Sequence, residues 1–329
     1  MGIQVTDLHL LRDQLLLRRE KLETAMAKSQ TANLVQLLDA VDRALERVDI
    51  GSYGICEVCD GTVESQRLLA DPLAKVCLGC LRPDEQRALE DDLELAARLQ
   101  SGLLPCIEKV PASWKVSYHY EPAGVVSGDY LDLIPHGQDL YFMMGDVSGK
   151  GIAASMLMAN LHAMFRALIP TGLPLEQLVE RANRIFSEST LPTQYATLIS
   201  GKADGFGSIE ICNAGHVPPY LVSAHGVRSL PSAAVPVGLF CDQKFSSMQL
   251  HLAPGDALVL YTDGVSEAED AGGRQYGESS FTQLLGDCLA LNSDELVNTC
   301  IQDLLKFRAG SARVDDQTLM VLRFSPSLV

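Results

Sequence analysis

Two pairs of closely spaced cysteines constrain the fold of this 329-residue chain more than any other feature. Cys56 lies near Cys59 and Cys77 near Cys80, and 17 residues separate the two pairs. Each C-x-x-C turn can direct two thiolates at one point, so both turns together supply the tetrahedral sulfur site that Zn²⁺ accepts. The spacing predicts a small module around one structural zinc ion, with free thiols as the alternative.

The N-terminus, the net charge and the remaining cysteines indicate where the chain resides and which partners it lacks. The N-terminus MGIQVTDLHLLRDQ shows no secretory signal, and no long uncharged apolar run predicts a membrane span, so we expect a cytoplasmic chain without membrane partners. The net charge of −16 disfavours direct nucleic-acid binding. We expect the other cysteines to be buried small hydrophobic residues. They are Cys106, Cys212, Cys241, Cys288 and Cys300.

Residues 6–49 have the apolar spacing of paired helices. Leu8, Leu15 and Leu22 repeat every seven residues, and a second apolar series runs from Leu34 to Val48 at spacings of four and three. A polar break at residues 29–31 predicts the tip of a helical hairpin. Residues 1–52 are therefore expected to form a hairpin or coiled coil, either as two helices packed on each other or as a coiled-coil probe or dimerisation arm.

Residues 84–104 predict a further amphipathic helix with an acidic face. Leu89, Leu93, Ala96 and Leu103 supply its apolar positions. The segment joins the cysteine-rich part, residues 53–83, to the rest of the chain. It is either a plain linker or a switch helix that repositions the C-terminal part of the chain.

The C-terminal two thirds alternate between strand-like and helix-like segments. Residues 152–169 and 174–186 have helical spacing. Short runs rich in β-branched and aromatic residues predict strands. They are KVSYHYEP, DLYFMMGDV, YATLISG, SIEIC, PPYLVS, ALVLYTDG and TLMVLRF. Many antiparallel strands with a few helices predict an α+β sandwich flanked by helices over residues 105–329.

Aspartates recur where these strands begin or end. Asp129 follows an extended segment, Asp146 closes an apolar strand, Asp263 follows ALVLYT, and the pair Asp315 and Asp316 precedes TLMVL. One aspartate beside a turn is ordinary turn chemistry, but four such positions favour convergence on one site. The run GDVSGKG after the second strand lacks the spacing of a nucleotide-binding loop, and its glycines instead allow the backbone to approach a metal.

Clustered carboxylates without histidine or thiol neighbours select hard cations such as Mn²⁺ or Mg²⁺. Two such ions can lower the pKa of a shared water and stabilise displacement at phosphorus. No activated serine, cysteine or histidine nucleophile is evident in the sequence. The pattern therefore predicts phosphomonoester hydrolysis by attack of metal-activated water.

The cysteine-rich segment resembles the DksA/TraR zinc finger. The resemblance rests on YGIC at residues 53–56, on RLLADP at residues 67–72 and on the second cysteine pair. It implies a structural zinc and, in some members, insertion of an acidic coiled-coil tip into RNA polymerase. Residues 29–33 lack the paired aspartates of such a tip, which argues against polymerase binding and favours a regulatory or dimerising module.

The C-terminal part is similar to the SpoIIE/RsbU-like branch of metal-dependent type 2C serine/threonine phosphatases. The motifs VSGDYLD, GDVSGKG, NAGHVPP, VGLF, YTDGVSEA and DDQT occur in the family's order. The resemblance covers about residues 95–325 and implies a two-metal centre acting on phosphoserine or phosphothreonine proteins. A helix before the core, similar to ELAARLQSGLLP here, implies regulation by an upstream module.

Carried over by position, the resemblance implies a set of metal ligands. Asp129 and Asp146 would hold the pair of ions, with Asp146 bridging them. Asp263 would bind from the far side, and Asp315 would close the site, with Asp316 as the alternative. The backbone carbonyl of Val147 would complete one coordination shell. Outside this set, Asp132 is expected to be structural. His216 is expected to order its loop, with proton donation to the leaving group as the alternative.

The sequence thus predicts a metal-dependent protein phosphatase with an N-terminal zinc-finger regulatory module. The resemblance implies a phosphorylated STAS-type anti-anti-sigma protein as substrate, and the heptads suggest a homodimer. One alternative is a transcription-machinery-binding regulator whose phosphatase-like part is a scaffold. Another is a phosphohydrolase that acts on small molecules.

Overall fold

The computed structural model describes residues 5–26, 32–191, 193–231, 234–311 and 313–326, which form two compact units. The first unit covers residues 1–92 and the second covers residues 93–329. Helix α4 (Pro83–Ser101) continues from one unit into the other.

The first unit consists of two long helices followed by the cysteine-rich segment. α1 (Val5–Met26) packs on α2 (Ala32–Asp49) through Leu15, Leu22 and Val41, which are buried. The hairpin prediction is confirmed for these helices, whereas most of the predicted tip, residues 29–33, lies outside the described residues. The cysteine-rich segment contains a short α3 (Ser65–Ala70) and a 3-10 turn at Leu78–Cys80.

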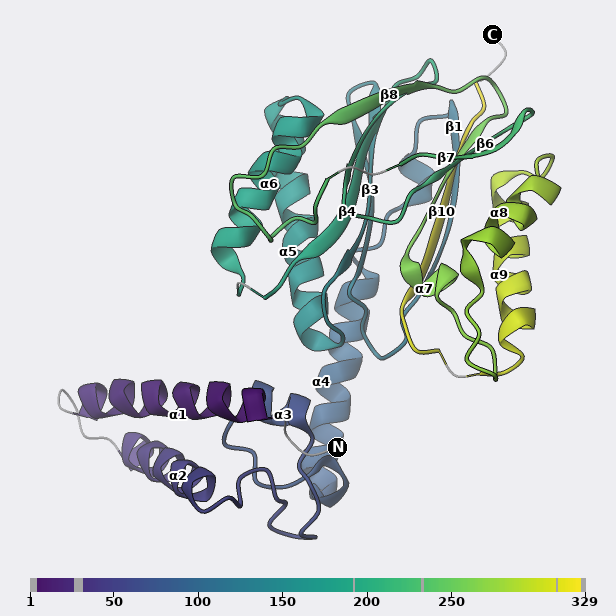
Figure 1. Cartoon of the computed structure of the whole chain (residues 1–329). Coiled ribbons are helices and arrows are strands. Elements are labelled where there is room, and N and C mark those ends of the chain that lie inside the picture. Colours follow the sequence, from purple (N-terminus) through teal and green to yellow (C-terminus); the bar gives the residue numbers. More distant parts are fainter. Residues whose placement is uncertain (1–4, 27–31, 192, 232–233, 312, 327–329) are drawn as a thin grey trace. The chain divides into compact units, whose positions relative to one another are not determined.

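The second unit is built on two antiparallel five-stranded sheets that face each other (Figure 1). One sheet has the order β1-β10-β9-β6-β7, and the other has the order β2-β3-β4-β5-β8. This arrangement confirms the expected α+β sandwich. The strands of the first sheet are β1 (Trp114–Glu121), β6 (Tyr220–Ser223), β7 (Gly226–Ser229), β9 (Ala257–Tyr261) and β10 (Gln317–Phe324). Those of the second sheet are β2 (Asp129–His136), β3 (Asp139–Val147), β4 (Ala196–Ala203), β5 (Ser208–Ala214) and β8 (Ser247–His251).

Helices cover the outer face of each sheet (Figure 1). α5 (Ile152–Leu168) and α6 (Leu175–Ser189) pack on the β2-β3-β4-β5 side. α8 (Gly277–Asp287) and α9 (Ser293–Arg308) cover the other sheet, where α9 contacts β1 and β10. The strands therefore bury both faces. In β3, Phe142 and Met144 enter the core between the sheets, while Met143 packs under α5 and α6.

Two expectations about apolar residues need correction. The stretch Ile152–Thr171 meets the length and composition of a membrane span, and 39% of its apolar window is buried, with Leu161 and Phe165 in the core against the sheet. That packing accounts for part of its apolar composition, whereas Ile152 and Met156 are exposed. Cys106 and Cys241 are exposed, although burial was expected for all five scattered cysteines.

Candidate metal centres

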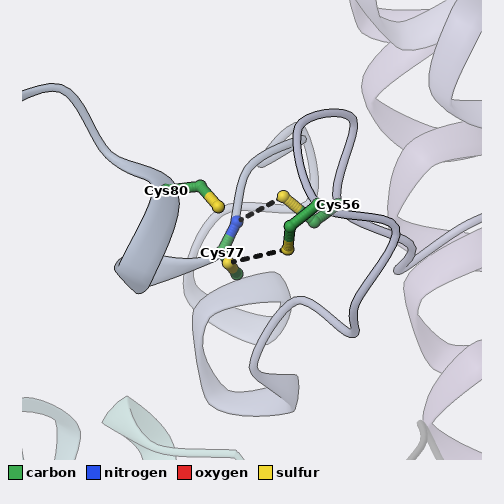
Figure 2. Close-up of side chains that lie close together, drawn as sticks. Cys56, Cys77 and Cys80 are labelled. Carbon is green, nitrogen blue, oxygen red and sulfur yellow. Dashed lines mark hydrogen bonds between the residues drawn. The ribbon is translucent and has the colours of Figure 1, made fainter.

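The four cysteines form a ready metal site. Their sulfur atoms all lie within 4.8 Å of one another. Figure 2 shows Cys56, Cys77 and Cys80 turned toward a common point. Cys56 Sγ accepts hydrogen bonds from the backbone N–H groups of Val58, at 3.5 Å, and Cys77, at 3.3 Å. These donors lower the pKa of Cys56 to about 6 and favour the thiolate that binds Zn²⁺.

The aspartates come together through strand register. Asp129 opens β2 and Asp146 lies near the end of β3, and the antiparallel ladder places them directly opposite each other. In the other sheet, Thr262 N donates to Thr318 O at 2.9 Å, which pairs the end of β9 with the start of β10. Asp263, Asp315 and Asp316 flank these two strand ends.

Two threonines join the sheets at this edge. Asp129 Oδ2 accepts hydrogen bonds from Thr262 Oγ1, at 2.9 Å, and from Thr318 Oγ1, at 2.5 Å. Thr262 and Thr318 belong to the first sheet's strand ends, whereas Asp129 belongs to the second sheet. The Asp129 carboxylate therefore lies where the two sheets meet, and only 1% of the residue is exposed.

Burial and like charges raise the pKa of these carboxyl groups. Asp129 has a pKa well above its ordinary value, first because of burial and then because of Asp146. Burial, with Asp263 and Asp315 as neighbouring charges, raises the pKa of Asp146 to about 7. Burial and Asp315 raise the pKa of Asp263 in the same direction. The edge thus concentrates negative charge that a cation would neutralise.

Asp315 and Asp316 differ in what their oxygens contact. Asp316 Oδ1 accepts from Ala123 N at 2.7 Å, and Asp316 Oδ2 accepts from Gly128 N at 2.8 Å. Asp315 instead directs Oδ2 at the ammonium of Lys150, 2.9 Å away. Both Asp316 oxygens therefore accept hydrogen bonds from the segment before β2, whereas Asp315 Oδ2 pairs with Lys150. Both carboxylates raise the pKa of Asp146.

The aspartate cluster is looser than the cysteine cluster. Among the residues that the structure describes, only the four cysteines form a group of three or more potential ligands with donor atoms within 4.8 Å of one another. Asp129, Asp146, Asp263 and Asp315 are close enough to shift one another's pKa in a connected chain. They share one edge of the sandwich without that tight spacing.

The two residues set apart from the ligand set have other partners. Asp132 is fully buried and receives two hydrogen bonds from Arg166, at 2.8 and 3.0 Å. His216 Nε2–H donates to Tyr261 O at 3.0 Å, and Nδ1 accepts from Thr197 Oγ1 at 2.7 Å. Burial lowers the pKa of His216 to about 4, so the ring is neutral at pH 7 and links the loop to β9.

Sequence reasoning missed several residues at this edge. Thr262 directly precedes Asp263, and Thr318 follows Asp316 by two residues, so their closeness in the sequence was a usable signal. Gln100, on α4, donates from Nε2 to Ser127 O at 2.7 Å and accepts from Ser127 N at 2.9 Å. Ser127 Oγ in turn accepts from Asp129 N at 3.0 Å. No spacing rule marks this glutamine, because its partners lie 27 residues away.

Family comparisons agree with this architecture. Residues 136–325 match the family model described as Stage II sporulation protein E (SpoIIE). The chain belongs to the SpoIIE family. Residues 51–86 match the prokaryotic dksA/traR C4-type zinc finger, so both resemblances seen in the sequence are confirmed.

Alignments with two named relatives cover most of this chain. "Protein IcfG" of Synechocystis is 26% identical over an alignment of 261 positions, which covers 70% of this chain and 41% of that protein. "Phosphoserine phosphatase RsbU" of Bacillus subtilis is 25% identical over 241 residues, covering 72% of this chain and 71% of RsbU. The chain therefore spans less than half the length of IcfG but most of RsbU.

Solved structures support a fold of the PP2C type. The RsbU and RsbW domains of Rv1364c from Mycobacterium tuberculosis give a TM-score of 0.59 at 26% identity, covering 66% of this chain and 61% of that one. The SiaA-PP2C domain of Pseudomonas aeruginosa gives a TM-score of 0.65 at 19% identity, covering 74% of this chain and 98% of that domain. The second likeness concerns the fold alone.

Proposed function

We propose that this chain is a metal-dependent phosphatase that hydrolyses phosphoserine or phosphothreonine on a regulatory protein. The register that sets Asp129 opposite Asp146, beside the strand ends that carry Asp263 and Asp315, carries this proposal. RsbU, a relative across most of its length, is named a phosphoserine phosphatase. Its name supports phosphoserine as the group that is hydrolysed.

The donor set fits two hard divalent cations. Asp129, Asp146, Asp263 and Asp315 would hold Mn²⁺ or Mg²⁺, with the Val147 carbonyl as a further ligand. Their raised pKa values reflect unneutralised like charges, which bound cations would relieve. We assign Asp315 rather than Asp316 to the ions, because both oxygens of Asp316 already accept backbone hydrogen bonds.

The chain's own groups define the rest of the chemistry. Bound divalent ions would lower the pKa of water and stabilise negative charge during displacement at phosphorus. Thr262 and Thr318 hold the Asp129 carboxylate in place through its Oδ2. His216 is a positioning residue, because both of its ring nitrogens are committed to Tyr261 and Thr197.

Hydrolysis of p-nitrophenyl phosphate tests the reaction. The full chain should turn over this substrate with Mn²⁺ or Mg²⁺, and Asp263→Asn should abolish turnover. Asp139→Asn is a matched control, since Asp139 lies at the opposite end of β3 and pairs with Lys202. Equal rates for wild type and Asp263→Asn would contradict the proposed site. A panel of phosphopeptides and phosphometabolites then separates the two substrate classes.

The finer identity of the substrate rests on the family. We infer a phosphorylated STAS-type protein in the cytoplasm, since the relatives include RsbU and a protein with joined RsbU and RsbW domains. The Asp263→Asn variant should retain such a protein in a pull-down. Phosphosite mapping of the retained material then identifies the modified residue. Recovery of phosphoproteins without a STAS domain would contradict this assignment.

We further infer that the N-terminal zinc-finger module acts on the phosphatase through α4. Gln100, at the C-terminal end of α4, holds the Ser127 backbone through two hydrogen bonds, and Ser127 holds the backbone of Asp129. A displacement of α4 would therefore disturb a proposed metal ligand through Ser127. The proposed units are the hairpin (1–52), the finger (53–83), the switch helix (84–104) and the phosphatase domain (105–329).

Substitution of Gln100 tests this route. Gln100→Ala should lower turnover about 10- to 100-fold, as loss of partners behind metal ligands commonly does. Gln86→Ala is the control on the same helix, where the side chain donates to Leu78 O at 3.3 Å. Equal turnover in Gln100→Ala and Gln86→Ala would contradict transmission through this contact.

A further inference from the structure

Lys150 places a positive charge next to the carboxylate cluster, beside Asp315. It lies in the loop between β3 and α5, four residues after Asp146. Its Nζ lies 2.9 Å from Asp315 Oδ2 and donates to Val314 O at 2.6 Å. The side chain is 56% exposed, so the ammonium group is both fixed at the cluster and open to solvent.

The charge of Lys150 reaches beyond its direct partner. It lowers the pKa of Asp146 and of Asp263, against the larger effects of burial and like charges. Lys150 sits between Gly149 and Gly151, whose φ values are +99° and +73° and around which a Cβ would meet nothing within 4 Å. The loop therefore leaves open space on both sides of the lysine.

Other basic side chains near Asp315 are committed elsewhere. Arg308 and Arg313 line a small surface pocket together with Asp315. Arg308 is buried and donates to Ser311 O at 2.5 Å, and Arg313 forms an ion pair with Glu121. Lys150 is thus the more exposed cation at this edge among these three.

Charge balance gives Lys150 a role. Two divalent ions carry the same total charge as four carboxylates, so a phosphoryl dianion entering the site would lack compensation from these groups alone. We propose that the Lys150 ammonium binds the phosphoryl oxygens of the substrate, exchanging its contact with Asp315 for one with the phosphoryl group. This inference rests on the proposed function, because it assigns a substrate-binding residue to the same site.

Phosphate binding to the full chain tests the inference. Inorganic phosphate is titrated by calorimetry into the Mn²⁺-loaded protein, and its competitive inhibition of p-nitrophenyl phosphate hydrolysis is measured in parallel. Lys150→Met should weaken phosphate binding and raise KM about 10-fold, the lower end for a hydrogen bond to a charged group. Lys150→Arg should restore most of the affinity, because the charge is kept.

The control is Lys202→Met. Lys202 also pairs with an aspartate, Asp139 at 3.0 Å, but at the far end of β3. It should leave phosphate binding and KM unchanged. Calorimetric titration of Mn²⁺ into each variant supplies a readout that does not depend on turnover, and Lys150→Met should bind Mn²⁺ at least as tightly as wild type, since a competing cation is removed.

Two results would overturn the inference. One is unchanged phosphate affinity in Lys150→Met. The other is a fall in Mn²⁺ affinity that accounts for the whole loss, which would make Lys150 a positioning residue for Asp315. A wild-type chain that binds phosphate through Lys150 but hydrolyses nothing would refute the proposed function while supporting this inference.

Discussion

The cysteine cluster and the aspartate cluster are built in opposite ways. The cysteines lie within 25 residues, from Cys56 to Cys80, and their sulfurs already converge. The aspartates extend from Asp129 to Asp315 and meet only because two sheets share an edge. In the finger the ligands create the fold, whereas in the phosphatase unit the fold creates the site.

The surrounding cores show the same difference. The core next to the cysteines has four buried members, Leu11, Cys56, Val63 and Leu68, so a zinc ligand is itself part of it. The phosphatase unit has three apolar clusters, each more than four times as large as the one beside the cysteines, so its core does not depend on a metal ligand for its size. Loss of metal should therefore unfold the finger and spare the sandwich.

The largest expected effect is the loss of zinc from the finger. Cys56→Ser should abolish Zn²⁺ binding and the folded structure of residues 53–81, since structural zinc supplies about 10–16 kcal/mol to such small modules. Zinc content and amide exchange measure this. Trp114, the single tryptophan, is buried in the sandwich, so its fluorescence reports the second unit alone. Its unfolding transition and basal hydrolysis should not change, and a shifted Trp114 transition would contradict the comparison.

The next largest effect is expected in the phosphatase unit, where a substitution should remove activity and leave the fold intact. Asp146→Asn should lower kcat more than about 100-fold, because even partners behind metal ligands contribute about 10- to 100-fold. Its Trp114 unfolding transition should stay at or above that of wild type without added metal, since a raised carboxyl pKa marks a group that is costly to ionise. A variant that unfolds under these conditions would show that the site supports the fold after all.

Local patterns explain which features could be predicted from the sequence. The cysteine spacing predicts the finger because both turns are short. Continuous apolar runs predict β3, β9 and β10, which are buried on both faces. β2 was missed because it holds Pro135, which is tolerated where β2 forms the edge of its sheet. α9 was also missed, although Asn292 and Glu295 form a capping box at its start.

Contacts between distant segments could not be predicted in this way. The four aspartates were identified from motif order, but their convergence depends on the pairing of Asp129 with Asp146 and on Thr262 and Thr318 crossing between sheets. The choice between Asp315 and Asp316 depends on Ala123 and Gly128, nearly 200 residues away. No local rule encodes a hydrogen bond over such a distance.

A smaller effect should follow from Thr318→Val. This change removes the hydroxyl that donates to Asp129 Oδ2 at 2.5 Å and nearly keeps the side-chain volume. Mn²⁺ affinity and kcat should each fall about 10-fold, the low end for a partner behind a ligand, because Thr262 still holds the same oxygen. The control is Thr171→Val, which removes a hydroxyl that donates to Leu168 O, away from the aspartates. Unchanged Mn²⁺ affinity in Thr318→Val would show that the fold alone orients Asp129.

The smallest expected effect is a difference in how falling pH destabilises the two regions. In the finger, acid acts through protonation of the zinc-bound thiolates. In the sandwich, it acts through His216, whose pKa is lowered by burial to about 4. The unfolded chain binds that proton near pH 6.5, so stability is present above pH 6.5 and is lost as the pH falls toward 4. The loss between pH 6.5 and pH 5 should be about 2 kcal/mol. Urea unfolding followed by Trp114 fluorescence should show it in wild type and in the exposed control His225→Gln, but not in His216→Gln. Equal pH dependence in all three proteins would assign the acid sensitivity of the sandwich to other groups. Chelation of zinc should leave the pH dependence of the Trp114 transition unaltered, because His216 lies in the unit whose fold is expected not to depend on metal.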